Sequence, residues 1–356
     1  MPLCRLEIER FRCLSSASLE FAPTCNLITG ANGSGKTSLL EAIFFLGSGR
    51  SFRSVGSDVL VQSSREDFVI VGAVQDDFDS EVCMGINWSP SERQLRVSGR
   101  EVNSFSEFAL RFPVQAIDPD VHKLIEDGPK RRRQFIDWGV FHVEHSFKDT
   151  WRRYNRALKQ RNSALSSKAS SRADIWNGEL ANQGTLIDQC RRRYLESLTP
   201  FIKKVGLSLL QDEVTIEYFQ GWKRNLTFIE ALQESQQSDL KRGVTTVGPH
   251  RADMLLKIGG ETAKEKISRG QQKMLACTLI LAQQAHKAAQ STPFPSLLLD
   301  DPAAELDVDN LHRLLQVVSE LPVQLFVTAL SLAGLEQLRH SKRFHIEGGV
   351  VNVVGY

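Results

Sequence analysis

Apolar and polar positions alternate along the first 29 residues, which predicts a pair of β-strands. Leu3, Leu6 and Ile8 stand between charged neighbours, and a second apolar group follows at 17–21. Residues 25–29 then form a short apolar run, typical of a buried strand. Residues 38–46 are apolar at nearly every position and predict a helix that ends at Gly47. The region therefore reads as strand, polar loop and helix.

Three more strands are predicted at 68–74, 81–88 and 94–97, because Asp, Gly, Ser and Pro separate these apolar runs. They form an antiparallel meander. From about residue 115 the pattern changes, and 120–210 has the apolar spacing of long polar helices. The serine-rich piece 163–171 is a loop at their tip or a frayed helical hairpin. Strand signals return at 214–218 and 254–258.

The last hundred residues predict a helix, two buried strands and a closing hairpin. The helix spans the apolar positions 274–281, and the strand 296–299 delivers Asp300 and Asp301 at its carboxyl end. The strand 324–328 fits a parallel sheet, and 344–346 with 350–353 form the hairpin.

Composition narrows the class of protein. The chain has 356 residues with 41% hydrophobic and 24% charged, ordinary values for a soluble protein. No apolar run approaches the roughly 18 residues of a membrane span. The start lacks the apolar core of a signal peptide, so a cytoplasmic location with no membrane is expected. The six scattered cysteines predict buried thiols.

Charge is uneven along the chain. Residues 130–224 carry 19 Lys and Arg against 10 Asp and Glu, hence +9, while the remainder carries −7. Phosphate contacts with nucleic acid would use such a surface, although solvated arginine-rich helix faces give the same count.

The polar loop carries the clearest chemistry, because it matches G-x-x-x-x-G-K-[ST] at every fixed position. Its glycines allow backbone N–H groups to converge on an anion at the positive end of the following helix. Lys36 would reach the β- and γ-phosphates and the Thr37 hydroxyl would ligate Mg²⁺. The predicted nucleotide-binding residues are Gly30, Ala31, Asn32, Gly33, Ser34, Gly35, Lys36, Thr37 and Ser38.

Spacing predicts how the nucleotide site is divided. Lys36 and Asp300 are 264 positions apart, so a large insertion separates two halves of one site. We expect a first lobe from 1–114 with 290–356 and a mainly helical second lobe from 115–289. Ser268, Gly270 and Gln271 start a helix about 30 residues before the Asp pair, the order found in ABC-type ATPases. In those proteins this helix start caps the γ-phosphate bound by a second subunit, which predicts an ATP-dependent homodimer.

Together these pieces resemble the RecF family of bacterial recombination-mediator ATPases, which have SMC-like heads. The resemblance covers essentially the whole length. It is carried by the phosphate loop and by four further stretches: 49–53, 128–137, 248–253 and 299–307, with the helix that starts at 268. It implies an α/β ABC/SMC-type P-loop ATPase head with an antiparallel meander and an inserted helical lobe.

The resemblance also implies roles for residues. Asp300 should hold Mg²⁺ with Thr37, Asp301 should orient the hydrolytic water, and Ser268 should contact the γ-phosphate in trans. Gln115 stands where related ATPases have the Q-loop glutamine, which contacts Mg²⁺ and water. The alternative is a glutamine that simply lies on the surface. Arg12 resembles an arginine on the nucleotide phosphates, with an exposed strand arginine as the alternative. The catalytic set is therefore Lys36, Asp301 and Ser268, with cofactors ATP and Mg²⁺.

Function follows from the same resemblance. We expect a slow, DNA-stimulated ATPase of recombinational repair and replication-fork restart that binds double-stranded and gapped DNA and helps RecO and RecR load RecA. The DNA-facing candidates are Lys130, Arg131, Arg132, Arg133, Arg152, Arg153, Arg156, Arg191, Arg192 and Arg193.

Three departures from related patterns bear on this interpretation. In the family an Arg-Asp-Asp run usually follows the histidine at position 250, and here Ala252 interrupts it. We interpret His250 itself as a turn histidine and not as a metal ligand. Ala329 occupies the place of a transporter's switch histidine, with Thr328 the nearest polar group. Asp301 stands where transporters have glutamate, which suits a slow switch.

Other classes remain open. An ABC transporter's ATPase subunit would carry Leu-Ser-Gly-Gly-Gln, where this chain has Ile-Ser-Arg-Gly-Gln. Another chromosome-associated SMC-like head would need long heptad arms. A purely structural DNA-binding protein would show no ATP dependence.

Overall fold

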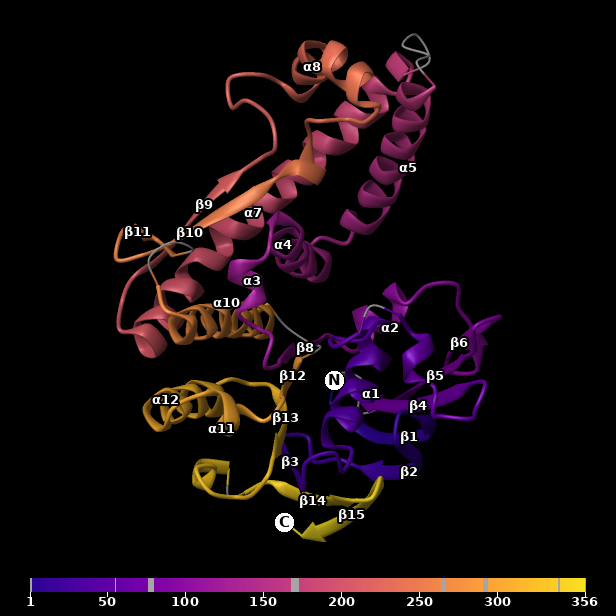
Figure 1. Cartoon of the computed structure of the whole chain (residues 1–356), viewed down its shortest axis with the longest axis vertical. Coiled ribbons are helices and arrows are strands. Elements are labelled where there is room, and N and C mark those ends of the chain that lie inside the picture. Colours follow the sequence, from indigo (N-terminus) through magenta and orange to yellow (C-terminus); the bar gives the residue numbers. More distant parts are fainter. Residues whose placement is uncertain are drawn as a thin grey trace. The chain divides into compact units, whose positions relative to one another are not determined.

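The computed structural model describes residues 2–54, 56–75, 80–167, 173–263, 267–290, 294–338 and 340–355 (Figure 1). The chain divides into two compact units, Met1–Val121 with Cys277–Tyr356, and His122–Ala276. The sequence placed these divisions at 114/115 and 289/290. The strand at 114–117 pairs inside the first unit, so the first unit extends past residue 114.

The first unit contains an antiparallel sheet with the strand order β2-β1-β4-β5-β6-β7. The predicted N-terminal pair and the predicted meander both form, and they join into this one sheet because β1 pairs with β4. Alternating apolar positions on both sets give the sheet one buried face. Its strands are β1 (Leu3–Phe11), β2 (Leu14–Glu20), β4 (Phe68–Gln75), β5 (Glu81–Trp88), β6 (Arg93–Val97) and β7 (Arg100–Glu101).

A second sheet of the same unit has the order β15-β14-β3-β13-β12-β8. The predicted parallel placement of β13 is confirmed, because it pairs in parallel with β12 and β3. The predicted closing hairpin of β14 and β15 also forms, and β8 and β14 extend the parallel set beyond the prediction. The strands are β3 (Cys25–Gly30), β8 (Val114–Ile117), β12 (Ser296–Leu299), β13 (Gln324–Ala329), β14 (Lys342–Glu347) and β15 (Val350–Gly355).

Helix α1 (Lys36–Ser48) lies in the core that the two sheets share. Nearly every residue from Ser38 to Gly47 is buried, as expected for a helix that is apolar on all sides. The helix ends one residue later than predicted, and Gly49 closes it in the left-handed conformation at φ 66°. The helix begins at Lys36, after the loop that follows β3, and its start therefore lies at the carboxyl end of the parallel strands.

Smaller helices complete the first unit. They are α2 (Ser106–Arg111), α11 (Pro302–Glu305) and α12 (Val308–Ser319), with 3₁₀ turns η1 (Asp58–Leu60) and η3 (Glu336–Leu338).

The second unit is mainly helical, as predicted, with a three-stranded sheet of order β11-β10-β9. Its helices include α7, a 34-residue helix with Pro200 in its interior. The predicted serine-rich loop lies partly outside the described residues. The elements are α3 (Lys123–Glu126), α4 (Pro129–Val143), α5 (Phe147–Ser166), α7 (Asn177–Leu210), β9 (Val214–Phe219), α8 (Phe228–Arg242), η2 (Pro249–Arg251), β10 (Asp253–Ile258) and β11 (Glu261–Thr262).

Helix α10 (Arg269–Ala289) begins in the second unit and continues into the first. Its residues from Met274 to Ala282 are buried, which confirms the predicted apolar helix. Across the described part of the chain, no helix combines the length and the apolar character that crossing a membrane requires.

Candidate nucleotide site

The loop between β3 and α1 forms a close-fitting backbone cradle. Gly30 has φ 154°, and a Cβ there would lie 2.3 Å from the Ile346 carbonyl oxygen. Gly35 has φ 118°, where a Cβ would lie 3.1 Å from Cys13 Sγ. Both positions therefore require glycine. The sequence spacing of the motif translates directly into this geometry.

The first turn of α1 is free to bind an anion. Its N-cap, Gly35, supplies no side-chain cap, and no acidic residue lies in the first turn. The N–H groups at a helix start carry a partial positive charge and need acceptors. The buried Ser34 hydroxyl also has no hydrogen-bond partner among the described residues. Unsatisfied donors at this point fit a bound phosphate.

Lys36 is buried and folded back over the loop. Its ammonium group donates to the carbonyl oxygens of Gly30 at 2.7 Å and Ala31 at 2.9 Å. Because the side chain already lies along the cradle, its charge is held where phosphate oxygens would sit.

Three oxygen groups meet at the ends of neighbouring strands. The Thr37 hydroxyl donates to Asp300 Oδ1 at 2.9 Å, and the Thr328 hydroxyl donates to the same oxygen at 2.8 Å. Asp300 directly follows β12, and Thr328 lies on β13, which pairs in parallel with β12. Hydroxyl and carboxylate oxygens are the ligands that Mg²⁺ prefers. The sequence predicted the Thr37–Asp300 pair and named Thr328 as the nearest polar group, but it did not predict the bond from Thr328 to Asp300.

Asp301 sits next to this pair in a left-handed backbone conformation, at φ 49° and ψ 53°. Its backbone N–H donates to the Thr328 hydroxyl at 2.9 Å. Burial raises the pKa of its carboxyl, and Lys36 acts in the opposite direction. At the place of the switch histidine, Ala329 is buried, and the neighbouring Thr328 is the side chain that contacts the Asp300 carboxylate and the Asp301 backbone.

Gln115 lies on β8 and is held by two glutamines of α10. Its Nε2 donates to Gln283 Oε1 at 2.8 Å, and its Oε1 accepts from Gln284 Nε2 at 2.6 Å. The side chain is therefore part-buried and fixed at both ends. Its role toward a nucleotide stays a prediction.

Arg12 is paired inside the protein, in a left-handed conformation at φ 53°. Its Nε and Nη2 donate to the two Glu41 oxygens, both at 2.9 Å, and Nη2 also reaches Ser54 at 3.2 Å. Glu41 is fully buried on α1, one helical turn beyond Thr37, and also accepts from Ser51. Glu41 thus joins Arg12 to the loop that follows α1.

Glu41 escaped the sequence analysis, although a signal was present. It is the single charged residue within an apolar stretch at 39–46, and a charge buried in such a helix needs a partner. The neighbouring Ser38 is buried too and contacts Cys13 Sγ at 3.4 Å.

Residues 268–271, the signature segment, begin α10 with two reciprocal capping hydrogen bonds. Gln271 N–H donates to Ser268 Oγ at 3.3 Å, and Ser268 N–H donates to Gln271 Oε1 at 2.9 Å. This is a capping box with Gln at its third helical position. The helix therefore starts where the sequence predicted, with Ser268 as its N-cap, and Ser268, Gly270 and Gln271 are all exposed.

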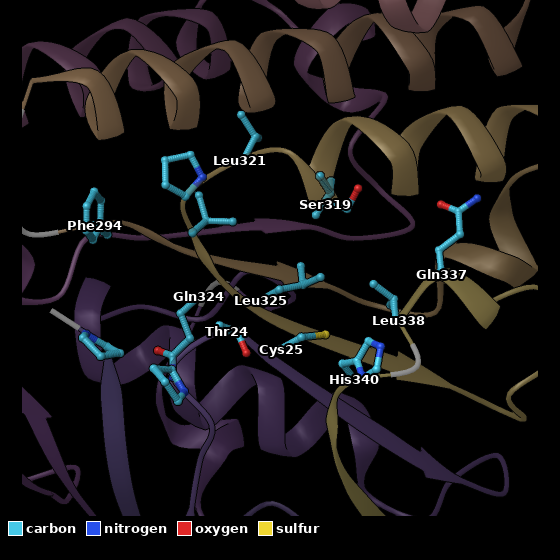
Figure 2. A pocket seen from close by; sticks show the side chains of 15 residues that line it. Thr24, Cys25, Phe294, Ser319, Leu321, Gln324, Leu325, Gln337, Leu338 and His340 are labelled. Atoms are coloured by element: carbon cyan, nitrogen blue, oxygen red, sulfur yellow. The ribbon is translucent and has the colours of Figure 1, made fainter. Parts of the chain in front are cut away.

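A cavity of about 560 Å³ lies at the other end of β3, where the strand begins (Figure 2). Thr24, Cys25, Leu325 and Leu338 line it with mostly apolar surface. The Gln324 amide beside them is already bonded to Leu3 and Ala22. In the part of the chain that the structure describes, no Asp, Glu, Lys or Arg lines this cavity, whereas Thr37 and Asp300 meet at the opposite, carboxyl end of the parallel strands.

Comparison with known proteins gives the family. A model of the RecF/RecN/SMC N terminal domain matches residues 2–350. The DNA replication and repair protein RecF of Shewanella baltica (strain OS155) is 38% identical over 360 residues, covering 99% of this chain and 100% of that protein. The chain belongs to the RecF family. RecF of Haemophilus influenzae is 36% identical, again with 99% of this chain covered.

Solved structures agree with this RecF assignment. A structure described as the recombination mediator protein RecF with ATP in the RecFOR pathway has a TM-score of 0.90 at 29% identity, covering 99% of this chain and 98% of that one. An SMC head bound to the C-terminal winged-helix domain of ScpA has a TM-score of 0.61 at 18% identity and supports the fold alone. The predicted ABC/SMC-type head is confirmed.

Two of the arginines that the sequence predicted to face DNA are buried inside this RecF-family protein. Arg191 is 0% exposed, pairs with both Asp137 oxygens at 2.8 and 3.0 Å, and donates to the Pro249 carbonyl at 2.7 Å. Arg132 is 7% exposed and pairs with Asp253 at 2.7 and 3.0 Å. Burial and pairing remove both guanidinium groups from the surface, so the predictions for Arg191 and Arg132 are wrong.

The remaining candidates vary in exposure. Arg193 is 64% exposed and pairs with Glu144, and Arg192 is 40% exposed and pairs with Asp188. The Arg133 guanidinium donates to the Ala252 carbonyl at 2.7 Å. Lys130 and Arg131 are exposed, as are Arg152, Arg153 and Arg156 on the outer face of α5.

The segment 248–253, which the sequence left without a role, is a packing centre of the second unit. His250 contacts the Tyr154 hydroxyl through Nδ1 at 2.6 Å, and Ala252 is fully buried. Burial lowers the pKa of His250 to about 4. Asp253, the aspartate at the end of this segment, pairs with Arg132.

Proposed function

We propose that this chain is an ATP-dependent DNA-binding protein of recombinational repair and replication-fork restart. The observation that carries this is the convergence of Lys36, Thr37 and Asp300 around an uncapped helix start. Full-length likeness to RecF proteins, one of them described with ATP, supports the same function.

ATP binding would use the loop from Gly30 to Thr37, with Ser38 behind it and Arg12 beside it. Mg²⁺ would be held by Thr37 and Asp300, where it would neutralise charge on the phosphate oxygens. Gln115 would complete this edge of the site. Asp301 would orient water for attack on the γ-phosphorus, in a slow ATPase whose turnover DNA stimulates.

ATP would also join two copies of the chain. Ser268, Gly270 and Gln271 are exposed at the start of a 21-residue helix, and a helix start favours an anion such as the γ-phosphate bound by a partner. A nucleotide that binds the dimer more tightly than the monomer shifts the association equilibrium, and hydrolysis reverses the shift.

DNA binding would use the exposed basic residues of the second unit. The outer face of α5 presents Arg152, Arg153, Arg156 and Lys159, all exposed, and Lys130, Arg131 and Arg193 are further candidates. Such a face contacts phosphates and carries no sequence preference. Double-stranded and gapped DNA are the expected ligands. RecR and RecO would be the protein partners, with RecA loading as the outcome, as the RecFOR description of the solved relative suggests.

Sedimentation velocity tests the core of this proposal. The protein is run without nucleotide, with ADP and with ATP plus Mg²⁺, each with and without a gapped duplex. We expect the protein to dimerise only in the presence of ATP plus Mg²⁺, and we expect DNA to bind mainly to that dimer. A monomer under every condition, or DNA binding indifferent to ATP, would refute the mechanism.

Two variants assign the roles within it. Lys36→Arg should keep ATP affinity and lose hydrolysis, and unchanged turnover would contradict the phosphate-loop assignment. Ser268→Arg should abolish ATP-driven dimerisation and leave ATP binding by the monomer intact. Ser208→Arg is the matched control, because Ser208 is an exposed helical serine away from the signature segment. Equal dimerisation of the two serine variants would contradict the trans role.

A further inference from the structure

Thr328 occupies a position that strand pairing fixes relative to both acidic residues. In the parallel pair of β12 and β13, Leu299 lies opposite Val327. The next residue of each strand is Asp300 on one side and Thr328 on the other. Thr328 is 0% exposed, so its hydroxyl can act only on groups within the protein.

The hydroxyl of Thr328 both accepts and donates a hydrogen bond, and its single proton can be placed. The oxygen accepts the backbone N–H of Asp301 at 2.9 Å. Its own hydrogen has two possible acceptors, Asp300 Oδ1 at 2.8 Å and the Leu299 carbonyl at 3.5 Å. The shorter contact to a charged acceptor is the stronger one. Thr328 therefore donates to Asp300 while it accepts from Asp301.

Asp301 depends on this contact for its direction. Among the described residues, no hydrogen bond or ion pair holds its carboxylate, so the backbone alone aims it. That backbone is left-handed at φ 49°, which costs a residue with a Cβ roughly 1 kcal/mol or more and persists only where neighbours enforce it. The bond from Asp301 N–H to Thr328 Oγ1 is the side-chain contact that enforces it.

Asp300 is oriented by the same group. Its Oδ1 accepts from Thr328 and from Thr37, which occupies both lone pairs of that oxygen. No described contact uses Oδ2, so the carboxylate presents this oxygen to a ligand in a fixed direction.

We propose that Thr328 is the positioning residue of this site, with one hydroxyl that sets the direction of both the Asp300 and the Asp301 carboxylates. The inference rests on the proposed ATPase function. In that reaction the water oxygen bonds to the γ-phosphorus as the bond to the bridging oxygen breaks. The products are ADP and inorganic phosphate, and the proton lost by the attacking water ends on the released phosphate. Thr328 touches none of these atoms and acts through the two carboxylates.

A packing role alone would give a different result from a positioning role. A buried threonine whose methyl group matters would tolerate valine and suffer from serine. A threonine whose hydroxyl matters would tolerate serine and suffer from valine, which is nearly isosteric but cannot hydrogen-bond. The pair of substitutions at one position separates the two roles.

The experiment measures single-turnover ATP hydrolysis and ATP affinity for wild type, Thr328→Val and Thr328→Ser. Thr278→Val is the matched control, because Thr278 is equally buried, on α10. We expect Thr328→Val to slow hydrolysis by about 10–100-fold, the usual effect of losing an outer-shell hydrogen bond, with ATP affinity in EDTA unchanged within about threefold. Thr328→Ser and Thr278→Val should stay within about threefold of wild type in both measurements.

Each outcome decides between the claims. If the wild-type protein hydrolyses ATP and Thr328→Val does so equally fast, the positioning role is overturned and the ATPase proposal stands. A Thr328→Ser variant as slow as Thr328→Val also overturns it, because the methyl group would then be responsible. A wild-type protein that binds ATP without hydrolysing it refutes the ATPase proposal, and the positioning role with it.

Discussion

Replacing Arg191 should destabilise the protein far more than replacing its neighbour Arg193. Arg191 is 0% exposed, donates three hydrogen bonds to Asp137 and Pro249, and lies over the Trp151 ring at 5.4 Å. Burial disfavours its charge, but Asp137 outweighs burial and raises the pKa of Arg191. Arg191→Gln leaves the Asp137 carboxylate and a buried carbonyl without partners, which should cost about 3–5 kcal/mol.

Arg193 supplies the control, because it follows on the same helix and is 64% exposed. An exposed ion pair contributes about 0–1 kcal/mol. Arg193→Gln should therefore shift the unfolding free energy by no more than about 1 kcal/mol. Chemical unfolding in urea, followed by tryptophan fluorescence, measures both variants, since Trp151 packs under the Arg191 guanidinium.

DNA binding measured well below the unfolding transition completes the test. We expect Arg191→Gln to keep the wild-type salt dependence, because a buried guanidinium releases no counterions. A variant that stays within 1 kcal/mol of wild-type stability but has a shallower salt slope would refute the assignment of Arg191 to the interior.

Three further changes have calculable results. Glu41→Gln removes the charge that pairs with Arg12 and should cost about 3 kcal/mol in urea unfolding, the low end for a buried pair because Arg12 is 24% exposed; an unchanged midpoint would contradict this. His250 has its pKa lowered to about 4 by burial, so the unfolded chain binds more protons below pH 6.5 and stability should fall by about 3 kcal/mol as pH drops from 6.5 to 4. His250→Gln should lose that part of the pH dependence. A plot of unfolding free energy against pH that runs parallel to the wild-type plot would refute the prediction. Gly30→Ala brings a Cβ to 2.3 Å from the Ile346 carbonyl and should lower stability by about 2 kcal/mol in thermal unfolding. Gly56→Ala is the control, because an added Cβ there meets no described atom within 4 Å and the backbone is not in the left-handed region.

The strands and helices were predictable where one local pattern decided them. The apolar run before Gly30 and the Asp pair after Leu299 are short signals, and both strands form where expected. The joining of β1 to β4 was not predictable, because register between distant strands depends on tertiary packing.

Charge clusters were the least predictable feature. Arg191, Arg192 and Arg193 are consecutive and chemically identical, yet a helix turns each by about 100° from the last. One therefore faces the core and one faces solvent. A count of charges cannot resolve this, because the partner of Arg191 is 54 positions away, on α4. Motif matching found Lys36 and Asp300 and pointed to Thr328 as a nearby polar group, but its bonds to Asp300 and Asp301 follow only from the register of two strands.

The position of β3 between β13 and β14 sets when this protein can become functional during its own synthesis. The phosphate loop leaves the ribosome early, but both strands that flank β3 lie beyond residue 323. At roughly 5–20 residues per second, an apolar strand waits unpaired for about 15–60 seconds. A message cut short before β13 would yield a product with the phosphate-binding sequence but without the two strands that flank β3.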